Sequence, residues 1–175
     1  MTHPGLVSPL TPAVEQTSRR HIVAALDRAL KIADPGTLAA LRRARGSAPP
    51  AAFYRVTVDI LDDALSEQGP RRDAIEGRWA IVAAAMATAQ GFLERVPLGE
   101  AMARAGIAEM RVVRLLEANP DQLVELTRNI VRQLVQKGQS FDPNDLADLV
   151  LSAGTPNEKT SRRTVARDFY RHQGD

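Results

Sequence analysis

The sequence predicts an all-α fold. Its apolar residues are mostly Ala, Leu and Val, aromatic side chains make up 4% of the chain, and few stretches alternate apolar with polar residues as strands do. Apolar positions instead recur three or four residues apart, and Pro or Gly stands near the ends of those segments. A chain of 175 residues that is 44% hydrophobic can bury a core. We therefore expect two small helical bundles joined by a short linker.

The first bundle is expected over residues 13–95, after a disordered N-terminal arm, residues 1–12, that contains three prolines. Helical spacing predicts four helices in this half, over residues 14–33, 37–45, 51–65 and 72–93. Asp34-Pro35-Gly36 ends the first of them, and Thr37 is the expected cap of the second. The fourth helix is the most hydrophobic, with Trp79 among many alanines, so we expect it at the centre of the bundle.

The second bundle is expected over residues 96–175. The pattern predicts five further helices, over residues 98–105, 107–117, 120–137, 143–151 and 161–172. Asn119 and Gln122 have the spacing of a capping box at the start of the third of these. On that helix Arg128 and Arg132 fall opposite the apolar stripe, so both are expected to face solvent.

Arginine dominates the basic residues: of 23 in total, only three are lysine. Residues 35–58 and 126–141 each hold several basic side chains and no carboxylate. The planar guanidinium binds phosphate oxygens in bidentate fashion and stacks on bases, whereas lysine is a hydrated point charge. A GC-rich genome would explain the number of arginines but not their clustering. The clustering predicts a phosphate-bearing partner.

Several functions are made improbable by what the chain lacks. It has no cysteine, hence no disulfide, thiolate zinc site or cysteine nucleophile, and its three histidines have no serine or acid at the spacing of a triad. We expect no catalytic residue, no cofactor and no metal site. With no signal peptide and no apolar run of membrane-spanning length, the expected protein is soluble and cytoplasmic, without a membrane partner.

Two carboxylate groups have alternative interpretations. Asp142, Asp145 and Asp148 could hold a divalent cation, but an Asp-Pro helix start is the interpretation we favour. The other group is expected to be solvated or paired with arginine, and consists of Asp59, Asp62 and Asp63.

The segment 98–116 has the helix, Gly106 turn and helix of a helix-turn-helix DNA reader. A recognition helix begins with side chains that reach base edges, whereas here Ile107 to Met110 offers few donors and one carboxylate. A DNA-binding regulator therefore remains an alternative. Another is an assembly-only module whose arginines pair with acidic surfaces of neighbouring subunits.

Four passages together resemble one known family. They are Leu41-Arg42-Arg43 with Ala52-Phe53-Tyr54-Arg55, then Leu98-Gly99-Glu100-Ala101-Met102-Ala103 with Arg111 and Arg114-Leu115-Leu116, then the basic helix 126–134, and then Ala166-Arg167-Asp168-Phe169-Tyr170-Arg171. In this order, and over about residues 38–171, they resemble the small subunit of the type I-E CRISPR surveillance complex Cascade, the family called CasB. One position departs from the family pattern, because Glu100 stands where arginine is common. We expect Glu100 to pair with Arg104, one turn on.

The resemblance implies a non-catalytic, all-helical protein in antiviral defence. Two copies would lie beside the guide RNA and the backbone and large subunits of Cascade. They would stabilise the R-loop by holding the displaced strand of the target DNA and bracing the guide–target duplex, while a separate nuclease cleaves. Arginines on rigid helices would form a track that ignores base identity.

Carrying the family's positions onto this sequence nominates nine arginines as nucleic-acid contacts. They are Arg42, Arg43, Arg55, Arg111, Arg114, Arg128 and Arg132, with Arg163 and Arg167 as weaker candidates because arginines near the end of the chain also suit protein docking. Tyr54 either stacks on a base or packs in the core beside Phe53.

Overall fold

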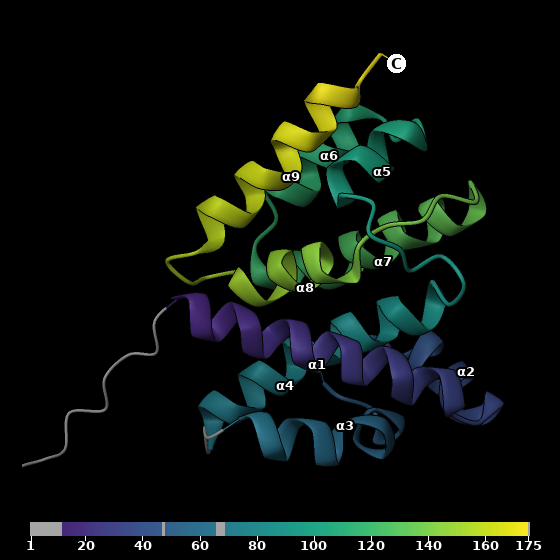
Figure 1. Cartoon of the computed structure of the whole chain (residues 1–175), viewed down its shortest axis with the longest axis vertical. Helices are drawn as coiled ribbons and strands as arrows, with labels where there is room; N and C mark the ends of the chain where they lie inside the picture. Colours follow the sequence, from purple (N-terminus) through teal and green to yellow (C-terminus); the bar gives the residue numbers. More distant parts are fainter. Residues whose placement is uncertain (1–11, 47, 66–68, 175) are drawn as a thin grey trace, which may run out of the picture.

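The computed structural model describes residues 12–46, 48–65 and 69–174, and these residues form nine α-helices (Figure 1). The helices are α1 (Pro12–Ile32), α2 (Pro35–Arg43), α3 (Ala51–Ala64), α4 (Pro70–Thr88), α5 (Leu98–Arg104), α6 (Glu109–Leu116), α7 (Pro120–Gln136), α8 (Pro143–Ser152) and α9 (Glu158–His172). The predicted all-α fold is confirmed, and every predicted helix is present. The proposed N-terminal arm lies outside the described residues, apart from Pro12, which begins α1.

The helix starts follow local side-chain chemistry. Asp34 caps α2, because its carboxylate accepts hydrogen bonds from the backbone N–H and the hydroxyl of Thr37, at 3.0 and 2.6 Å. The prediction that Thr37 is the cap was wrong: Thr37 is inside the helix and binds the true cap. The predicted capping box of Asn119 and Gln122 is present at the start of α7.

The first four helices pack on one another. Helix α2 lies against α4, while α1 packs on α3 and also touches α4. Trp79 of α4 is only 2% exposed, and a row of buried alanines lets the neighbouring helices approach closely. Helix α4 ends at Thr88, earlier than predicted, before a turn at Gly91, whose φ of 85° suits glycine.

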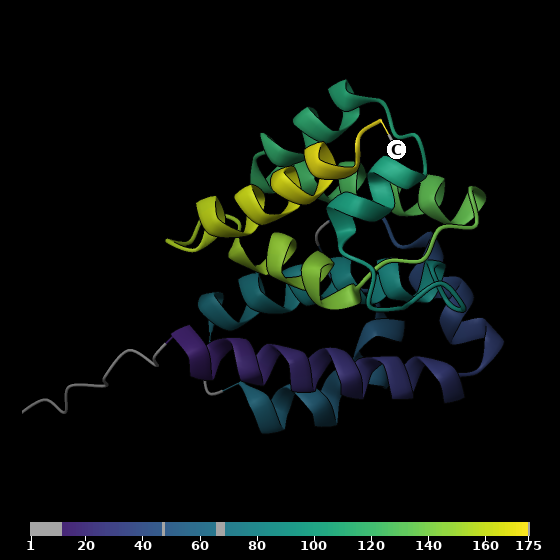
Figure 2. The same ribbon diagram turned by 45° about the horizontal axis from the view of Figure 1, so that its top comes forward.

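The last five helices are organised around the crossing of α5 and α9. Gly99 of α5 lies against the backbone of α9, and a Cβ there would be 2.1 Å from the carbonyl oxygen of Val165. Only glycine fits this crossing. Helix α6 lies on the other side of α9, and α8 packs beneath them (Figure 2).

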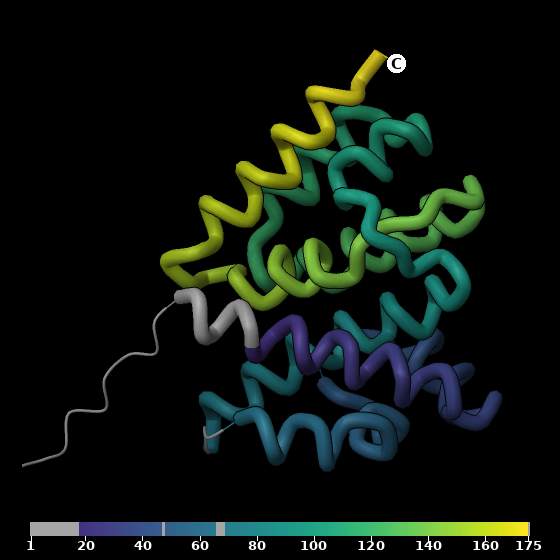
Figure 3. Tube along the Cα trace, viewed as in Figure 1, coloured from purple at the N-terminus to yellow at the C-terminus, as the bar shows by residue number. Residues whose placement is uncertain are grey.

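The two halves of the chain share a core. Helix α4 packs on α7 and α8, α1 packs on α8, and Arg19 of α1 forms an ion pair of 3.3 Å with Asp148 of α8. The segment that connects α4 to α5 runs beside the segment that connects α7 to α8 (Figure 3). Leu93 of the first segment and Phe141 of the second form an isolated β-bridge. The bundle division near residue 95 stays a prediction. These contacts make the two halves interdependent and fix α2 and α7 next to each other.

Candidate nucleic-acid interface

The structure separates the nine nominated arginines into two groups. Six are exposed and form no hydrogen bond or ion pair with any described residue: Arg43, Arg55, Arg114, Arg132, Arg163 and Arg167. The other three, Arg42, Arg111 and Arg128, bind other parts of the protein. The free guanidinium groups of the first group are the ones available to a partner.

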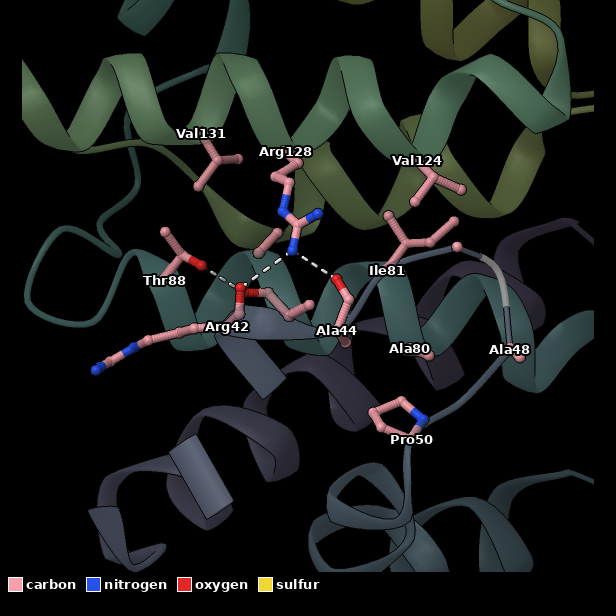
Figure 4. A pocket seen from close by; sticks show the side chains of 13 residues that line it. Arg42, Ala44, Ala48, Pro50, Ala80, Ile81, Thr88, Val124, Arg128 and Val131 are labelled. Atoms are coloured by element: carbon pink, nitrogen blue, oxygen red, sulfur yellow. Dashed lines mark hydrogen bonds between the residues drawn. The ribbon is translucent and has the colours of Figure 1, made fainter. Parts of the chain in front are cut away.

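Arg128 does not face solvent as the helical pattern predicted. Its side chain is 11% exposed and crosses from α7 to the end of α2, over a small and mainly apolar pocket (Figure 4). Its Nη2 donates to the carbonyl oxygens of Ala44, at 2.5 Å, and Arg42, at 3.2 Å. Glu125 lies 3.4 Å from the same guanidinium. Arg128 therefore satisfies carbonyls that the end of α2 leaves without helical partners.

Arg42 and Arg111 are exposed but are not free. Arg42 donates from Nε to the carbonyl oxygen of Ala87, at 2.8 Å, and from Nη2 to Gln90. Arg111 of α6 donates to the side chain of Gln133 of α7. Both arginines thus link neighbouring parts of the fold through neutral acceptors. The same guanidinium N–H groups could donate to a phosphate in place of these acceptors.

A first basic surface forms where α2 ends against α7, and we call it the α2–α7 surface. Its members are Arg42, Arg43, Arg45, Arg128 and Arg132. Burial is the main cause that lowers the pKa of Arg128, and the charges of Arg45 and Arg132 lower it further. Like charges thus meet here with one carboxylate, Glu125, to offset them. Arg45 was not nominated from the sequence, although it lies in the carboxylate-free stretch 35–58.

A second basic surface, the α6–α9 surface, consists of Arg114, Arg163 and Arg167. Two contacts tie these helices together: Arg162 donates to the carbonyl oxygen of Ala118, at 2.6 Å, and Tyr170 donates to Glu109, at 2.8 Å. Since the start of α9 meets the end of α6, the two helices run antiparallel. This arrangement places arginines that are about 50 residues apart in the chain on adjacent helices, with Arg114 about 140° around α6 from Glu109 and so directed away from α9.

Arg55 is not part of either surface. It lies on α3 near Asp34, whose pKa is lowered mainly by its hydrogen bonds to Thr37 and to a smaller extent by the charge of Arg55. Tyr54, beside it, packs edge-on against the fully buried Phe53, and its own side chain is 43% exposed, so it lies at the edge of the core.

Glu100 behaves as its position predicted. Its Oε1 forms an ion pair of 2.5 Å with Arg104 of the next turn, and its Oε2 lies 3.8 Å from His172. The carboxylate is therefore paired with Arg104 of α5 and lies close to His172 of α9.

The carboxylate groups have structural roles. Asp142 caps α8, Asp148 pairs with Arg19, and Asp145 accepts a hydrogen bond of 2.9 Å from the backbone N–H of Leu98 at the start of α5. The helix-start interpretation is confirmed for Asp142.

In the second carboxylate group, Asp62 is paired with Arg72 at 2.5 Å. Among the residues that the structure describes, no cluster of three or more His, Asp or Glu side chains could hold a metal ion.

The fold and its surfaces define an all-helical protein with free guanidinium groups gathered on helix faces. Residues 37–170 match the profile of a family described as CRISPR-associated protein Cse2, and the chain therefore belongs to this family. The resemblance to the small subunit of type I-E Cascade is thereby confirmed. No helix within the described ranges is long and apolar enough to cross a membrane.

One solved structure shares the fold over almost the whole chain. It is a chain in the crystal structure of E. coli Cascade bound to a PAM-containing double-stranded DNA target with a 32-nt spacer. The TM-score is 0.63 at 22% sequence identity, and the alignment covers 86% of this chain and 95% of that one. No curated protein matches the sequence.

Proposed function

We propose that this chain is the non-catalytic small subunit of a type I-E Cascade complex in antiviral defence, and that it holds nucleic acid by its backbone. Two findings support the proposal: the chain belongs to the Cse2 family, and a chain of the same fold is part of E. coli Cascade bound to DNA. Its partners would be the guide RNA, the target DNA, the backbone and large subunits and a second copy of itself, all in the cytoplasm.

The observation that carries the proposal is the presence of unpartnered, exposed guanidinium groups on two helical surfaces. Arg43 and Arg132 belong to the α2–α7 surface, and Arg114, Arg163 and Arg167 form the α6–α9 surface. None of these five arginines forms an ion pair with a described residue. Guanidinium groups without such pairs bind phosphate oxygens without first breaking a bond.

Such contacts carry no base information, which suits a complex in which guide pairing reads the sequence. Opening the target duplex is a nearly balanced exchange, because the RNA–DNA duplex is about as stable as the DNA duplex that it replaces. Modest phosphate contacts to the displaced strand are then enough to favour the open state. The rigid helices hold the arginines in place, so that little conformational entropy is lost when the strand binds.

The proposal is tested with two triple variants that remove the same charge. In the first variant, Arg43, Arg114 and Arg132 are each changed to Gln. The second variant is the matched control, in which the exposed Arg20, Arg28 and Arg71 are each changed to Gln. For Cascade assembled with each variant, the R-loop lifetime and the affinity for the target are measured over a series of salt concentrations. If about six phosphates of a single strand are bound, log affinity falls with log salt at a slope near −4, and the first variant makes that slope shallower by about 2.

We expect the first variant to shorten R-loop lifetime equally on every target sequence and the control to leave it unchanged. Equal losses in both variants would contradict the assignment of these residues. Losses that depend on particular bases would favour a helix-turn-helix reader. Normal R-loops together with weakened subunit assembly would favour the assembly-only module.

A further inference from the structure

The chain has two tyrosines, and both lie in the same short motif, Phe53-Tyr54-Arg55 on α3 and Phe169-Tyr170-Arg171 on α9. In each motif the phenylalanine is buried and the tyrosine is close to half exposed. Each tyrosine ring meets the preceding phenylalanine ring edge-on, with ring centroids 5.3 and 5.4 Å apart. The buried ring therefore fixes the root of an aromatic side chain that still presents surface to solvent.

The far end of each ring is also fixed. Tyr54 donates its hydroxyl to Glu76 of α4, at 3.2 Å, and Tyr170 donates to Glu109 of α6, at 2.8 Å. The hydrogen bond to Glu109 is the main cause that raises the pKa of Tyr170, so the hydroxyl stays protonated at neutral pH. A ring held at both ends loses little rotamer freedom when a planar group stacks on it.

The two tyrosines differ in the charge around them. Burial is the main cause that raises the pKa of Tyr54; the carboxylates of Glu76 and Asp73 raise it further, and the charge of Arg72 lowers it. The exposed Asp62 pairs with the same arginine. The only charge that contributes to the raised pKa of Tyr170 is that of Glu109. Tyr54 therefore has more carboxylates around it than Tyr170.

Two free guanidinium groups precede Tyr170 on its own helix. Arg167 precedes it by one turn of α9. Arg163 lies one further turn back, and at 100° per residue Arg163, Arg167 and Tyr170 fall on one side of α9. Met110, which is 63% exposed, extends the apolar surface next to Glu109. An exposed aromatic ring next to free arginines has the composition of single-strand binding sites.

We propose that Tyr170 stacks on a base of a single-stranded nucleic acid whose phosphates are bound by Arg163 and Arg167. This inference rests on the proposed function and adds to it a contact with the base itself. Every base has an aromatic face, so the contact tolerates all sequences, as a displaced strand requires. It also explains why the α6–α9 surface contains an aromatic side chain and not arginines alone.

The test compares an oligo-dT with an abasic oligonucleotide of the same length and charge, because stacking needs a base and phosphate binding does not. Binding to the full-length chain is measured by fluorescence anisotropy at low salt for the wild type, Tyr170→Leu and Tyr170→Phe. Tyr54→Leu is the matched control. The ring and the hydroxyl of Tyr54 make the same kinds of contact as those of Tyr170, but the two tyrosines differ in the charges around them. Thermal unfolding confirms that each variant is folded.

We expect the wild type, Tyr170→Phe and Tyr54→Leu to bind oligo-dT about tenfold more tightly than the abasic strand, the size of one stacked base. Tyr170→Leu binds both strands with the affinity that the wild type has for the abasic one. Should Tyr170→Leu fail to fold, the other three proteins still test the inference, because a wild type that does not distinguish the strands overturns it.

Two further outcomes separate this inference from the proposed function. Wild-type protein that binds both strands equally contradicts stacking and leaves phosphate binding in place, whereas wild-type protein that binds neither strand contradicts the proposed function as well. If Tyr170→Leu still distinguishes the strands but joins the other Cascade subunits more weakly, Tyr170 belongs to a protein interface and the stacking inference is wrong.

Discussion

Arg128 illustrates how one side chain can join two parts of a chain that are far apart in sequence. Its guanidinium binds carbonyl oxygens of Arg42 and Ala44, more than 80 residues away, and thereby holds the end of α2 against α7. Helical periodicity correctly predicts that Arg128 and Arg132 lie off the apolar stripe. It cannot predict that another helix end covers one of them, because that contact depends on tertiary packing and leaves no local pattern in the sequence.

We expect Arg128→Ala to lower the free energy of unfolding by about 1–3 kcal/mol, since it leaves carbonyls at the end of α2 without their charged donor. Arg132→Ala, on the same helix but exposed and unpartnered, is the control and changes the free energy of unfolding by less than about 0.5 kcal/mol. Urea denaturation measures both. Equal effects would show that the Arg128 hydrogen bonds do not stabilise the fold.

At the scale of helices the sequence is most informative, because helix ends depend on nearby residues. Asn119 and Gln122 identify the start of α7, and Pro and Gly mark most other boundaries. The choice of Asp34 over Thr37 as the cap of α2 needed the structure, since either side chain suits the position. The close crossing of α5 and α9 at Gly99 was also not predicted, because a glycine inside a helix does not reveal which helix lies against it.

Helix α5 has an unusual start that makes stability depend on pH. Asp145 of α8 accepts a hydrogen bond from the N–H of Leu98, but burial, its main influence, raises the pKa of Asp145 above the ordinary 3.8. The charges of Asp142, Asp148 and Asp168 raise it further. The folded state therefore binds this proton more tightly than the unfolded state, and stability is lost as pH rises from 3.8 through the folded-state pKa.

Asp145→Asn keeps an oxygen that accepts from Leu98 and removes the titration. We expect the stability of the wild type relative to this variant to fall as pH rises through that window and to level off above it. Urea denaturation of both proteins between about pH 3.5 and 7 gives the difference, in which most other titrating groups cancel. A difference that stays constant with pH would contradict the assignment to Asp145.

At the scale of the whole molecule, the basic surfaces arise from packing. The carboxylate-free stretches indicate that cations cluster, and the resemblance nominates most of the arginines. Only the fold shows that the helix of Arg114, α6, packs against the helix of Arg163 and Arg167, α9, while Arg55 stands apart. Sequence spacing relates residues within one helix, whereas the antiparallel contact of α6 and α9 depends on the core between them.

We expect the two halves to unfold together. Helix α4 packs on α7 and α8 as well as on its own bundle, and Arg19 and Arg128 bind across the same boundary. Calorimetry of the full chain should show one transition with equal calorimetric and van't Hoff enthalpies. Two resolved transitions would instead support independent bundles that meet at residue 95.

The burial of Trp79 gives the protein its own optical probe. This indole is the single one in the chain and lies on the helix that both halves cover. Its emission will shift to longer wavelength when water reaches α4, whichever half detaches first. Loosening of the shared helix during assembly or strand capture can thus be followed in real time without attaching a dye.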